Sequence, residues 1–222
     1  MKIGIVHTSV TDEEEQEIEE AIRSVVDGEV EFYVQSDSNI LKSVKSYENI
    51  PPLVVTDIVK MYMNAVREKC DVILSACVTV SMVCEHMKNV LKMIKIPMIS
   101  IEAGMCDEAV RIGKRIGILG TVGTSMKVVE DRMKSLQENQ HIDGEVIAQL
   151  IEVRTTTTKE DLDKRMLEES IKIANQVDVI LFAQGSMAHA AEGISNRIGK
   201  PVLGSVASAA KQLKEVMNTY DA

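Results

Sequence analysis

Short apolar segments alternate with amphipathic segments along the whole chain. In the first half the apolar segments, which are expected to be strands, cover residues 2–7, 29–35, 71–76 and 96–101. The amphipathic segments, which are expected to be helices, cover residues 11–25, 52–68 and 78–91, with a polar loop before Pro52. This order is typical of a parallel sheet with helices on both faces, so the sequence predicts an α/β fold.

The second half of the chain repeats the first. Residues 71–74, Asp-Val-Ile-Leu, recur unchanged at 178–181, and residues 2–8 are echoed by residues 115–121. A third match joins residues 96–100 to residues 200–204. Three matches in the same order rarely arise by chance. They predict two pseudo-symmetric halves, each a four-stranded parallel sheet flanked by helices, with the active site in the cleft between them.

The borders of the two halves follow from the repeat. The first half is expected at residues 1–104 and the second at 105–204. Residues 205–217 carry apolar side chains at helical spacing, so the C-terminal helix, 205–222, is expected to fold back and complete the first half. Thr157 and Glu160 form a capping-box pattern that is expected to open a helix running through Ala174.

Charge and composition narrow the possible partners. The 222 residues carry a formal net charge of −9 and only 3% aromatic side chains, with no Trp. Nucleic acid and anionic membranes would be repelled, and few rings are available to stack on bases. No apolar run reaches the roughly 18 residues that span a bilayer, and the N-terminal pattern is not that of a signal peptide. We expect a cytoplasmic protein with neither partner.

Metal and nucleotide cofactors are not expected. The four cysteines, Cys70, Cys77, Cys84 and Cys106, do not form a disulfide framework, and no CxxC or Cys/His pair has zinc spacing. Glycines at 117, 120 and 123 give the pattern GxxGxxG, whereas a dinucleotide loop needs GxGxxG followed at a distance by an acidic residue. The better interpretation of this loop is a turn that binds a carboxylate.

Small polar residues follow the predicted strands at their carboxyl ends, where open parallel sheets bind ligands. In the first half these are Thr8, Ser9, Cys77, Thr79 and Ser81. In the second half the matching loops carry Thr121, Gly123, Thr124, Gln184 and Ser186. Hydroxyl groups, glycines and backbone amides suit a small carboxylate or phosphate ligand.

Cys77 is the strongest candidate for chemistry among these residues. It follows a buried strand and opens a predicted helix, so the helix dipole and nearby amides are expected to favour its thiolate. The other three cysteines are expected to be structural. Of the histidines, His7 is expected near the site and His189 could approach it, whereas His86 and His141 are expected at the surface.

On these residues the chain resembles the aspartate/glutamate racemase superfamily, which includes glutamate, aspartate and hydantoin racemases, maleate isomerase and arylmalonate decarboxylase. Residues 74–81 resemble the loop of the family's first catalytic cysteine, with Thr79 at the substrate-binding hydroxyl. Thr121 and Thr124 fall where the family binds a substrate carboxylate. The resemblance implies a homodimer without a cofactor, in which two cysteines on opposite faces of an α-carbon remove and return its proton.

One residue departs from that pattern. The repeat pairs Cys77 with Gln184, which stands where the second thiol would be, and an amide cannot transfer a proton near neutral pH. The leading hypothesis is an isomerase for a small amino acid or carboxylic acid, with Cys77 as acid/base or nucleophile and Gln184 as a polar contact. A one-cysteine lyase or decarboxylase, and a small-acid-binding protein without activity, stay open. A cysteine hydrolase is less well supported, because no Cys–His–Asp arrangement is visible.

Three further roles stay open at this stage. His189 is a candidate to replace the missing second base. Glu102 could contact a substrate amino group, form a salt bridge or cap a helix. Arg154 could bind a second carboxylate.

Overall fold

The computed structural model describes residues 1–8, 11–44, 50–154 and 156–220. Within these residues the strands form two four-stranded parallel sheets, ordered β2-β1-β3-β4 and β6-β5-β7-β8. The first sheet contains β1 (Lys2–His7), β2 (Glu31–Ser36), β3 (Val72–Ser75) and β4 (Met98–Ser100). The second contains β5 (Arg115–Gly120), β6 (Glu145–Leu150), β7 (Val179–Phe182) and β8 (Val202–Leu203). The predicted α/β fold with two four-stranded halves is confirmed.

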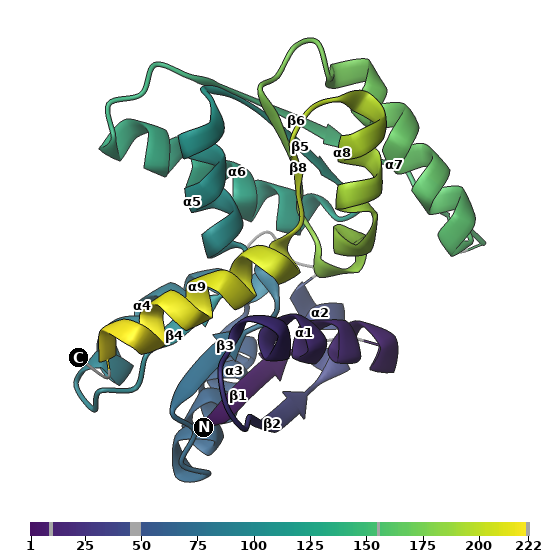
Figure 1. The fold of residues 1–222 in the computed structure, drawn as a ribbon. Coiled ribbons are helices and arrows are strands. Elements are labelled where there is room, and N and C mark those ends of the chain that lie inside the picture. The colour runs from purple at the N-terminus through teal and green to yellow at the C-terminus, as the bar shows by residue number, and fades with distance from the viewer. Residues whose placement is uncertain (9–10, 45–49, 155, 221–222) are drawn as a thin grey trace. The chain divides into compact units, whose positions relative to one another are not determined.

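The chain divides into two compact units, Met1–Ile101 with Ala209–Ala222, and Glu102–Ser208. The first unit holds α1 (Asp12–Val25), α2 (Ser38–Val44), α3 (Pro52–Arg67), the 3₁₀ turn η1 (Val78–Val80) and α4 (Ser81–Lys92). The second holds α5 (Ala103–Ile112), α6 (Gly123–Asn139), α7 (Lys159–Ile173), the 3₁₀ segment η2 (Gly185–Ala190) and α8 (Ala191–Ile198). The last helix, α9 (Ser205–Tyr220), begins in the second unit and continues in the first (Figure 1).

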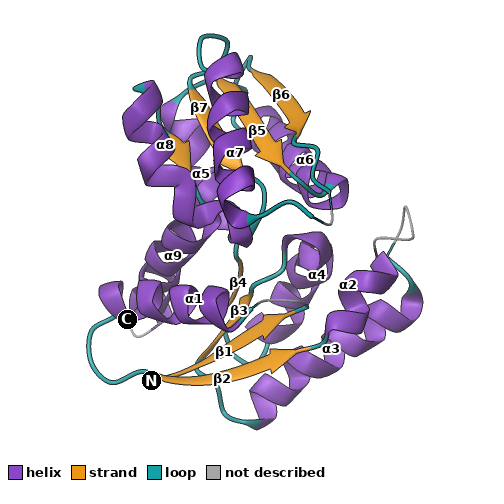
Figure 2. Ribbon diagram, turned by 90° about the vertical axis from the view of Figure 1, so that its right-hand side faces the viewer, coloured by secondary structure: helices purple, strands orange, loops and turns teal. Residues whose placement is uncertain are grey.

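Helices cover both faces of the first sheet. On one face α2, α3 and α4 pack against the strands and bury a core that includes Ile58, Tyr62 and Leu91. Helices α1 and α9 lie on the other face (Figures 1 and 2). Helix α1 begins with the capping box of Thr11 and Glu14, in which each side chain accepts the other residue's backbone N–H. Its buried residues, Ile18 and Ile22, are four apart and therefore share one side of the helix.

The second sheet is covered in the same way. Helices α7 and α8 bury a core on one face that includes Met166, Phe182 and Ile194. Helices α5 and α6 cover the other face (Figure 1). The strands β3 and β7 are short and fully buried on both sides, as expected for strands between two helical layers.

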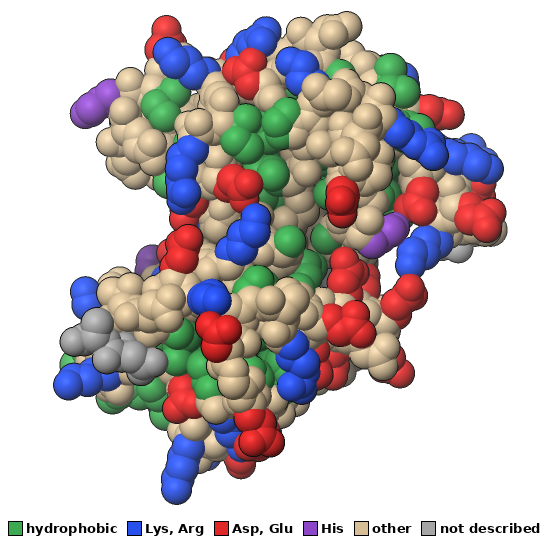
Figure 3. Space-filling view, viewed as in Figure 1, with side chains coloured by type: hydrophobic (Ala, Val, Ile, Leu, Met, Phe, Trp, Pro, Cys, Tyr) green, Lys and Arg blue, Asp and Glu red, His purple; other side chains and the backbone are tan. Residues whose placement is uncertain are grey.

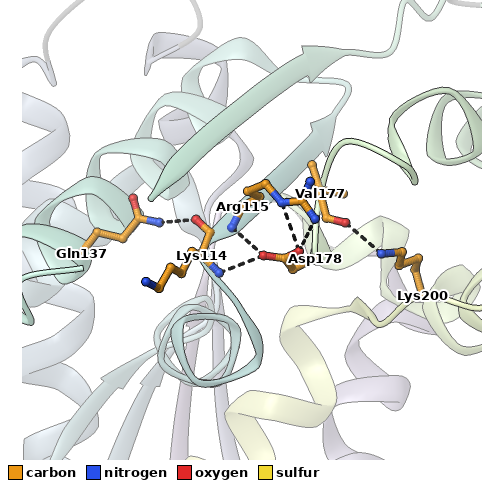
Figure 4. Close-up of polar contacts among 6 residues, drawn as sticks. All are labelled: Lys114, Arg115, Gln137, Val177, Asp178 and Lys200. Carbon is orange, nitrogen blue, oxygen red and sulfur yellow. Dashed lines mark hydrogen bonds and ion pairs between the residues drawn. The ribbon is translucent and has the colours of Figure 1, made fainter. Parts of the chain in front are cut away.

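The register of the two sheets repeats position by position. Ile3 pairs with Val72 in the first sheet, and the residues at the matching places in the repeat, Ile116 and Val179, pair in the second. Each sheet also carries an aspartate at the amino end of its third strand. Asp178 Oδ2 accepts the backbone N–H of Lys114 at 3.0 Å and of Arg115 at 2.9 Å (Figure 4).

The contact of Asp178, and that of Asp71 at the matching place, joins two neighbouring strands and is called the latch below. In the first unit Asp71 Oδ2 accepts the backbone N–H of Lys2 at 2.7 Å, at the matching place. Hollows of about 740 and 440 Å³ lie at these amino ends, lined largely by charged side chains that include Lys2 and Asp71 in one and Arg115 and Asp178 in the other. Several of these charges pair with one another, for example Lys2 with Glu31 and Arg115 with Asp178. The latch therefore joins the amino ends of the strands. The predicted ligand-binding residues lie at the opposite, carboxyl ends.

Local predictions differ from the structure at three places. The segment before Pro52 was expected to be a loop, but residues 38–44 form α2, because Ile40 and Val44 lie one turn apart and are buried. The helix cap is Thr158, which accepts the N–H of Asp161, whereas Thr157 accepts the N–H of Arg154. The segment after Cys77 begins as the 3₁₀ turn η1, and the α-helix starts only at Ser81.

Lys, Arg, Asp and Glu side chains are interspersed over the face of the molecule shown in Figure 3. Ion pairs join some of the exposed charges, such as Lys214 and Asp27 at 3.2 Å. In the described part of the chain, no helix is both long enough and apolar enough to span a bilayer.

Candidate active site

Each sheet has one topological switch point at its carboxyl edge. In the first sheet β2 lies on one side of β1 and β3 on the other, so the crevice between the ends of β1 and β3 is where such a sheet binds a ligand. In the second sheet the same point lies between β5 and β7. The residues that follow these strands are those that the sequence singled out.

In the first unit the switch point brings Thr8 and Cys77 together. The Thr8 hydroxyl donates a hydrogen bond to Cys77 Sγ at 2.8 Å. The backbone N–H groups of Thr79 and Val80 and the Thr79 hydroxyl also donate to this sulfur. Thr8 and Thr79 are buried, while Cys77 is partly exposed. Four donors therefore converge on one reactive atom.

The protonation state of Cys77 differs from the sequence-based expectation. Burial raises the pKa of its thiol, and the hydrogen bonds from Thr8, Thr79 and Val80 offset that effect only in part. The expectation of a favoured thiolate is therefore wrong, because the sequence pattern does not show how much protein surrounds the sulfur. The resting group is a thiol whose ionised form already has its hydrogen-bond donors in place.

In the second unit the switch point brings Thr121 and Gln184 together. Gln184 Oε1 accepts the backbone N–H of Thr121 at 2.7 Å, and Gln184 Nε2 donates to Thr121 Oγ1 at 2.7 Å. The amide thus contacts Thr121 with both of its polar atoms.

The two pairs occupy matching places in the repeat. Ala76 N–H donates to the carbonyl of Val6 at 2.8 Å, and Ala183 N–H donates to the carbonyl of Leu119 at 2.9 Å. These bonds fix the residues that come next, Cys77 and Gln184, beside the ends of β1 and β5. The sequence-based pairing of the two positions is supported by this common backbone geometry.

Gly120 lies against the Gln184 amide, a neighbour that the sequence did not indicate. A Cβ atom at this position would lie 2.9 Å from Gln184 Oε1 and 2.6 Å from Met126 Cγ, so any larger residue would disturb the amide. A signal was present in the repeat, where the last residue of β1 is His7 but the last residue of β5 is glycine.

The other predicted site residues are distributed over both units. Thr124 Oγ1 is a buried atom with no hydrogen-bond partner among the described residues, at the start of α6. Gly123 and Ser186 are exposed, and Ser81 is buried at the start of α4. Ser9 lies outside the described residues.

The four histidines differ in burial and in whether a carboxylate lies beside them. His7 is buried, and its Nε2 lies 3.2 Å from Glu15 Oε2. Burial lowers the pKa of His7 more than Glu15 raises it. His189 Nε2 lies 2.9 Å from Asp163 Oδ1 in the second unit. His86 and His141 are exposed, as expected.

The structure also gives places to Glu102 and Arg154. Glu102 is fully buried, and its Oε1 lies 3.9 Å from Arg132 Nη1, so the salt bridge that the sequence left open is present. Burial of the Cys106 thiol raises its pKa, the negative charge of Glu102 raises it further, and Arg132 opposes both effects. Arg154 is exposed. Among the residues described, no three His, Cys, Asp or Glu side chains are grouped so that they could hold a metal ion.

Two parallel sheets related by an internal repeat, each with a polar pair at its switch point, define a duplicated α/β protein with one candidate ligand site in each half. The sequence profile of the Asp/Glu/hydantoin racemases matches residues 3–213. The chain therefore belongs to the Asp/Glu/hydantoin racemase family. A search of the curated proteins finds no match.

Solved structures show the same fold at low sequence identity. Allantoin racemase from Klebsiella pneumoniae is 14% identical, over 99% of this chain and 88% of its own, with a TM-score of 0.71. A glutamate racemase isoform from Bacillus anthracis is 16% identical, over 98% and 81%, with a TM-score of 0.72. Maleate isomerase from Pseudomonas putida is 15% identical, over 98% and 92%, with a TM-score of 0.65.

Proposed function

We propose that this protein is a cofactor-independent isomerase that moves a proton at the α-carbon of a small amino acid or carboxylic acid, with Cys77 as the acid/base. The observation that carries the proposal is the Cys77 sulfur, which lies at a switch point and accepts hydrogen bonds from Thr8, Thr79 and Val80. Membership of the racemase family supports it.

The proposed step is a proton transfer between carbon and sulfur. The thiolate of Cys77 takes the α-proton and becomes a thiol, while the electron pair of the broken C–H bond moves onto the carboxylate oxygens. The thiol then returns a proton to the carbon. Backbone N–H groups and hydroxyls stabilise the charge that builds on those oxygens, and we assign this role to Thr121 and Thr124.

The residue at position 184 limits the stereochemistry. The Gln184 amide can donate and accept hydrogen bonds but cannot exchange a proton with carbon near neutral pH. Proton exchange by Cys77 alone takes place on one face of the α-carbon. We therefore expect the α-proton to exchange with solvent much faster than the configuration inverts.

Deuterium exchange tests this function. The protein is incubated in heavy water with single enantiomers of a panel of small amino and carboxylic acids, and the α-proton is followed by NMR together with chiral analysis. We expect α-proton exchange in at least one acid, with inversion at a much lower rate. The exchange rate should rise with pH because the thiolate is the base, and exchange should be lost in Cys77→Ala. Cys84→Ala is the matched control, since Cys84 is a buried cysteine of the same unit.

The results separate the alternatives. Exchange that persists in Cys77→Ala would overturn the proposal. Binding of an acid without exchange or turnover would favour a small-acid-binding protein.

A one-cysteine lyase is the second candidate, and the observation in its favour is the amide at Gln184. A lyase that removes carbon dioxide needs only one proton donor, because the proton replaces the leaving carboxyl group on the same carbon. Release of carbon dioxide from substituted malonates, lost in Cys77→Ala, would select this activity over isomerisation.

A further inference from the structure

We propose that Gln184 is a positioning residue, which holds Thr121 so that the Thr121 hydroxyl hydrogen is available to a ligand carboxylate. The inference rests on the proposed function and assigns position 184 to ligand binding rather than to proton transfer. It is carried by the two hydrogen bonds between Gln184 and Thr121.

The backbone fixes the orientation of the amide. The Thr121 N–H can only donate, so the atom of Gln184 that lies 2.7 Å from it must be the oxygen. The amide nitrogen then faces Thr121 Oγ1, also at 2.7 Å, and must donate to it. The reverse orientation would place two N–H donors against each other.

This orientation determines what the hydroxyl can do. A threonine hydroxyl has one hydrogen and two lone pairs. Gln184 Nε2 donates to one lone pair of Thr121 Oγ1, so the hydroxyl hydrogen of Thr121 does not bond to Gln184. That hydrogen can be donated to a carboxylate oxygen, which accepts charge-assisted hydrogen bonds.

At the matching place in the first unit, the hydrogen bond of the threonine hydroxyl runs in the opposite direction. There the hydroxyl of Thr8 donates its hydrogen to the sulfur of Cys77 at 2.8 Å. A thiol or thiolate at position 184 would take the hydrogen of Thr121 in the same way. The amide therefore changes the threonine from a partner of the residue beside it into a donor for a ligand.

The packing holds this arrangement in place. Gln184 Oε1 lies 2.9 Å from the position that a Cβ atom of Gly120 would occupy, so the amide lies against the backbone of β5. Gln184 itself has extended backbone angles at the start of η2. The side chain is therefore held between Gly120 and Thr121.

Two substitutions separate the two hydrogen bonds. Gln184→Glu keeps an oxygen for the Thr121 N–H, but its carboxylate is an acceptor only and diverts the hydroxyl hydrogen to itself. Gln184→Met removes both bonds at similar size. Each is made in the natural chain and in Thr121→Val, which has no hydroxyl. Gln176→Met is the control, because Gln176 is exposed and its side-chain amide donates to the carbonyl of Lys172, one helical turn earlier.

The measurement is the Kd of acetate and succinate by NMR titration of the folded full-length protein, with the Thr121 amide resonance as a separate report on the Gln184 contact. We expect both substitutions to weaken binding about tenfold or more when Thr121 is present, as expected for a lost bond to a charged group. In Thr121→Val, the uncharged Gln184→Met should weaken binding less than about twofold, whereas the charge of Gln184→Glu repels the anionic probes with or without the hydroxyl. The Thr121 amide should shift in Gln184→Met and much less in Gln184→Glu. Gln176→Met should leave both readouts unchanged.

The outcomes separate this inference from the proposed function. Equal weakening by Gln184→Met with and without the Thr121 hydroxyl, unchanged affinity in both Gln184 variants, or no binding of either probe would overturn the positioning role. Binding that depends on Gln184 through Thr121, in a protein that shows no Cys77-dependent exchange or turnover, would keep the positioning role and overturn the isomerase.

Discussion

The threonine hydroxyls at the two switch points form hydrogen bonds in opposite directions. The Thr8 hydroxyl donates to Cys77 Sγ, whereas the Thr121 hydroxyl accepts from Gln184 Nε2. The two threonines occupy matching places in the repeat, so the residue beside each one sets the direction of its hydrogen. A change of one residue after a strand can therefore change the chemistry of a sheet edge while the backbone stays the same.

The contact between Thr8 and Cys77 predicts how fast the thiol reacts. The Thr8 hydroxyl lowers the pKa of Cys77, although burial keeps that pKa above its usual value. Thr8→Val should therefore raise the pKa further and reduce the thiolate fraction at pH 8. We expect alkylation of Cys77 by iodoacetamide to slow about three- to tenfold, the effect of one hydrogen bond. Thr8→Ser keeps the donor and serves as control, and equal slowing in both variants would contradict the assignment.

The glycine at the end of β5 predicts a local loss of stability. A Cβ at Gly120 would press on Gln184 Oε1 and Met126 Cγ, so Gly120→Ala should lower the free energy of unfolding by about 1–3 kcal/mol. Gly193→Ala is the matched control. Gly193 lies inside α8 with open space around its Cβ position, and alanine there should stabilise the protein by up to about 1 kcal/mol. Urea unfolding of both variants checks the prediction, and a neutral Gly120→Ala would contradict it.

At the scale of elements, the strands and their register could be predicted because the two sheets repeat the same apolar pattern. The predicted bounds of β1, residues 2–7, agree with the structure. Helix α2 could not be predicted, since its few apolar residues show their role only when Ile40 and Val44 pack against the sheet and α3. The choice of Thr158 over Thr157 as helix cap depends on backbone angles that a run of threonines does not reveal.

The candidate site was predictable to a similar degree. The repeat predicts the places of Cys77 and Gln184, because residues at matching positions after matching strands lie at the carboxyl ends of their own sheets. The pKa of Cys77 and the bonds between Gln184 and Thr121 were not predictable, because both depend on burial and side-chain direction.

The latch between β5 and β7 predicts a dependence of stability on pH. Hydrogen bonds from Arg115 lower the pKa of Asp178 to about 2, and the bond from its guanidinium has the largest effect. This pKa is well below that of a carboxyl in the unfolded chain. A group with a lowered pKa contributes its full stability above the unfolded-state value and loses it as the pH falls toward the folded-state value. Asp178→Asn should therefore cost about 1 kcal/mol at neutral pH, a modest figure because the pair is partly exposed to solvent.

The difference between the natural chain and Asp178→Asn should shrink between pH 5 and pH 2.5. Urea unfolding over this range measures it. Asp27→Asn controls for the loss of a negative charge, since the Asp27 side chain is 96% exposed. A difference that stays constant with pH would show that the latch does not depend on the ionised carboxylate.

At the scale of the whole molecule, each unit is completed by a helix that follows the last strand of the other. Helix α5 comes directly after β4 of the first sheet and belongs to the second unit. Helix α9 comes after β8 of the second sheet, and from Ala209 onward it belongs to the first unit. A destabilising substitution in α9 from Ala209 onward should therefore loosen the first sheet more than the second, although the second sheet directly precedes α9 in the sequence.

Leu213 offers a test of this exchange of helices. Its side chain is fully buried, so Leu213→Ala should cost about 2–5 kcal/mol. Because residue 213 belongs to the first unit, amide hydrogen exchange should rise in β1 to β4 more than in β5 to β8. Ile194→Ala, at a buried position of α8, should show the reverse pattern. If Leu213→Ala increased exchange in β5 to β8 as much as in β1 to β4, α9 would have to be assigned to the stability of both units.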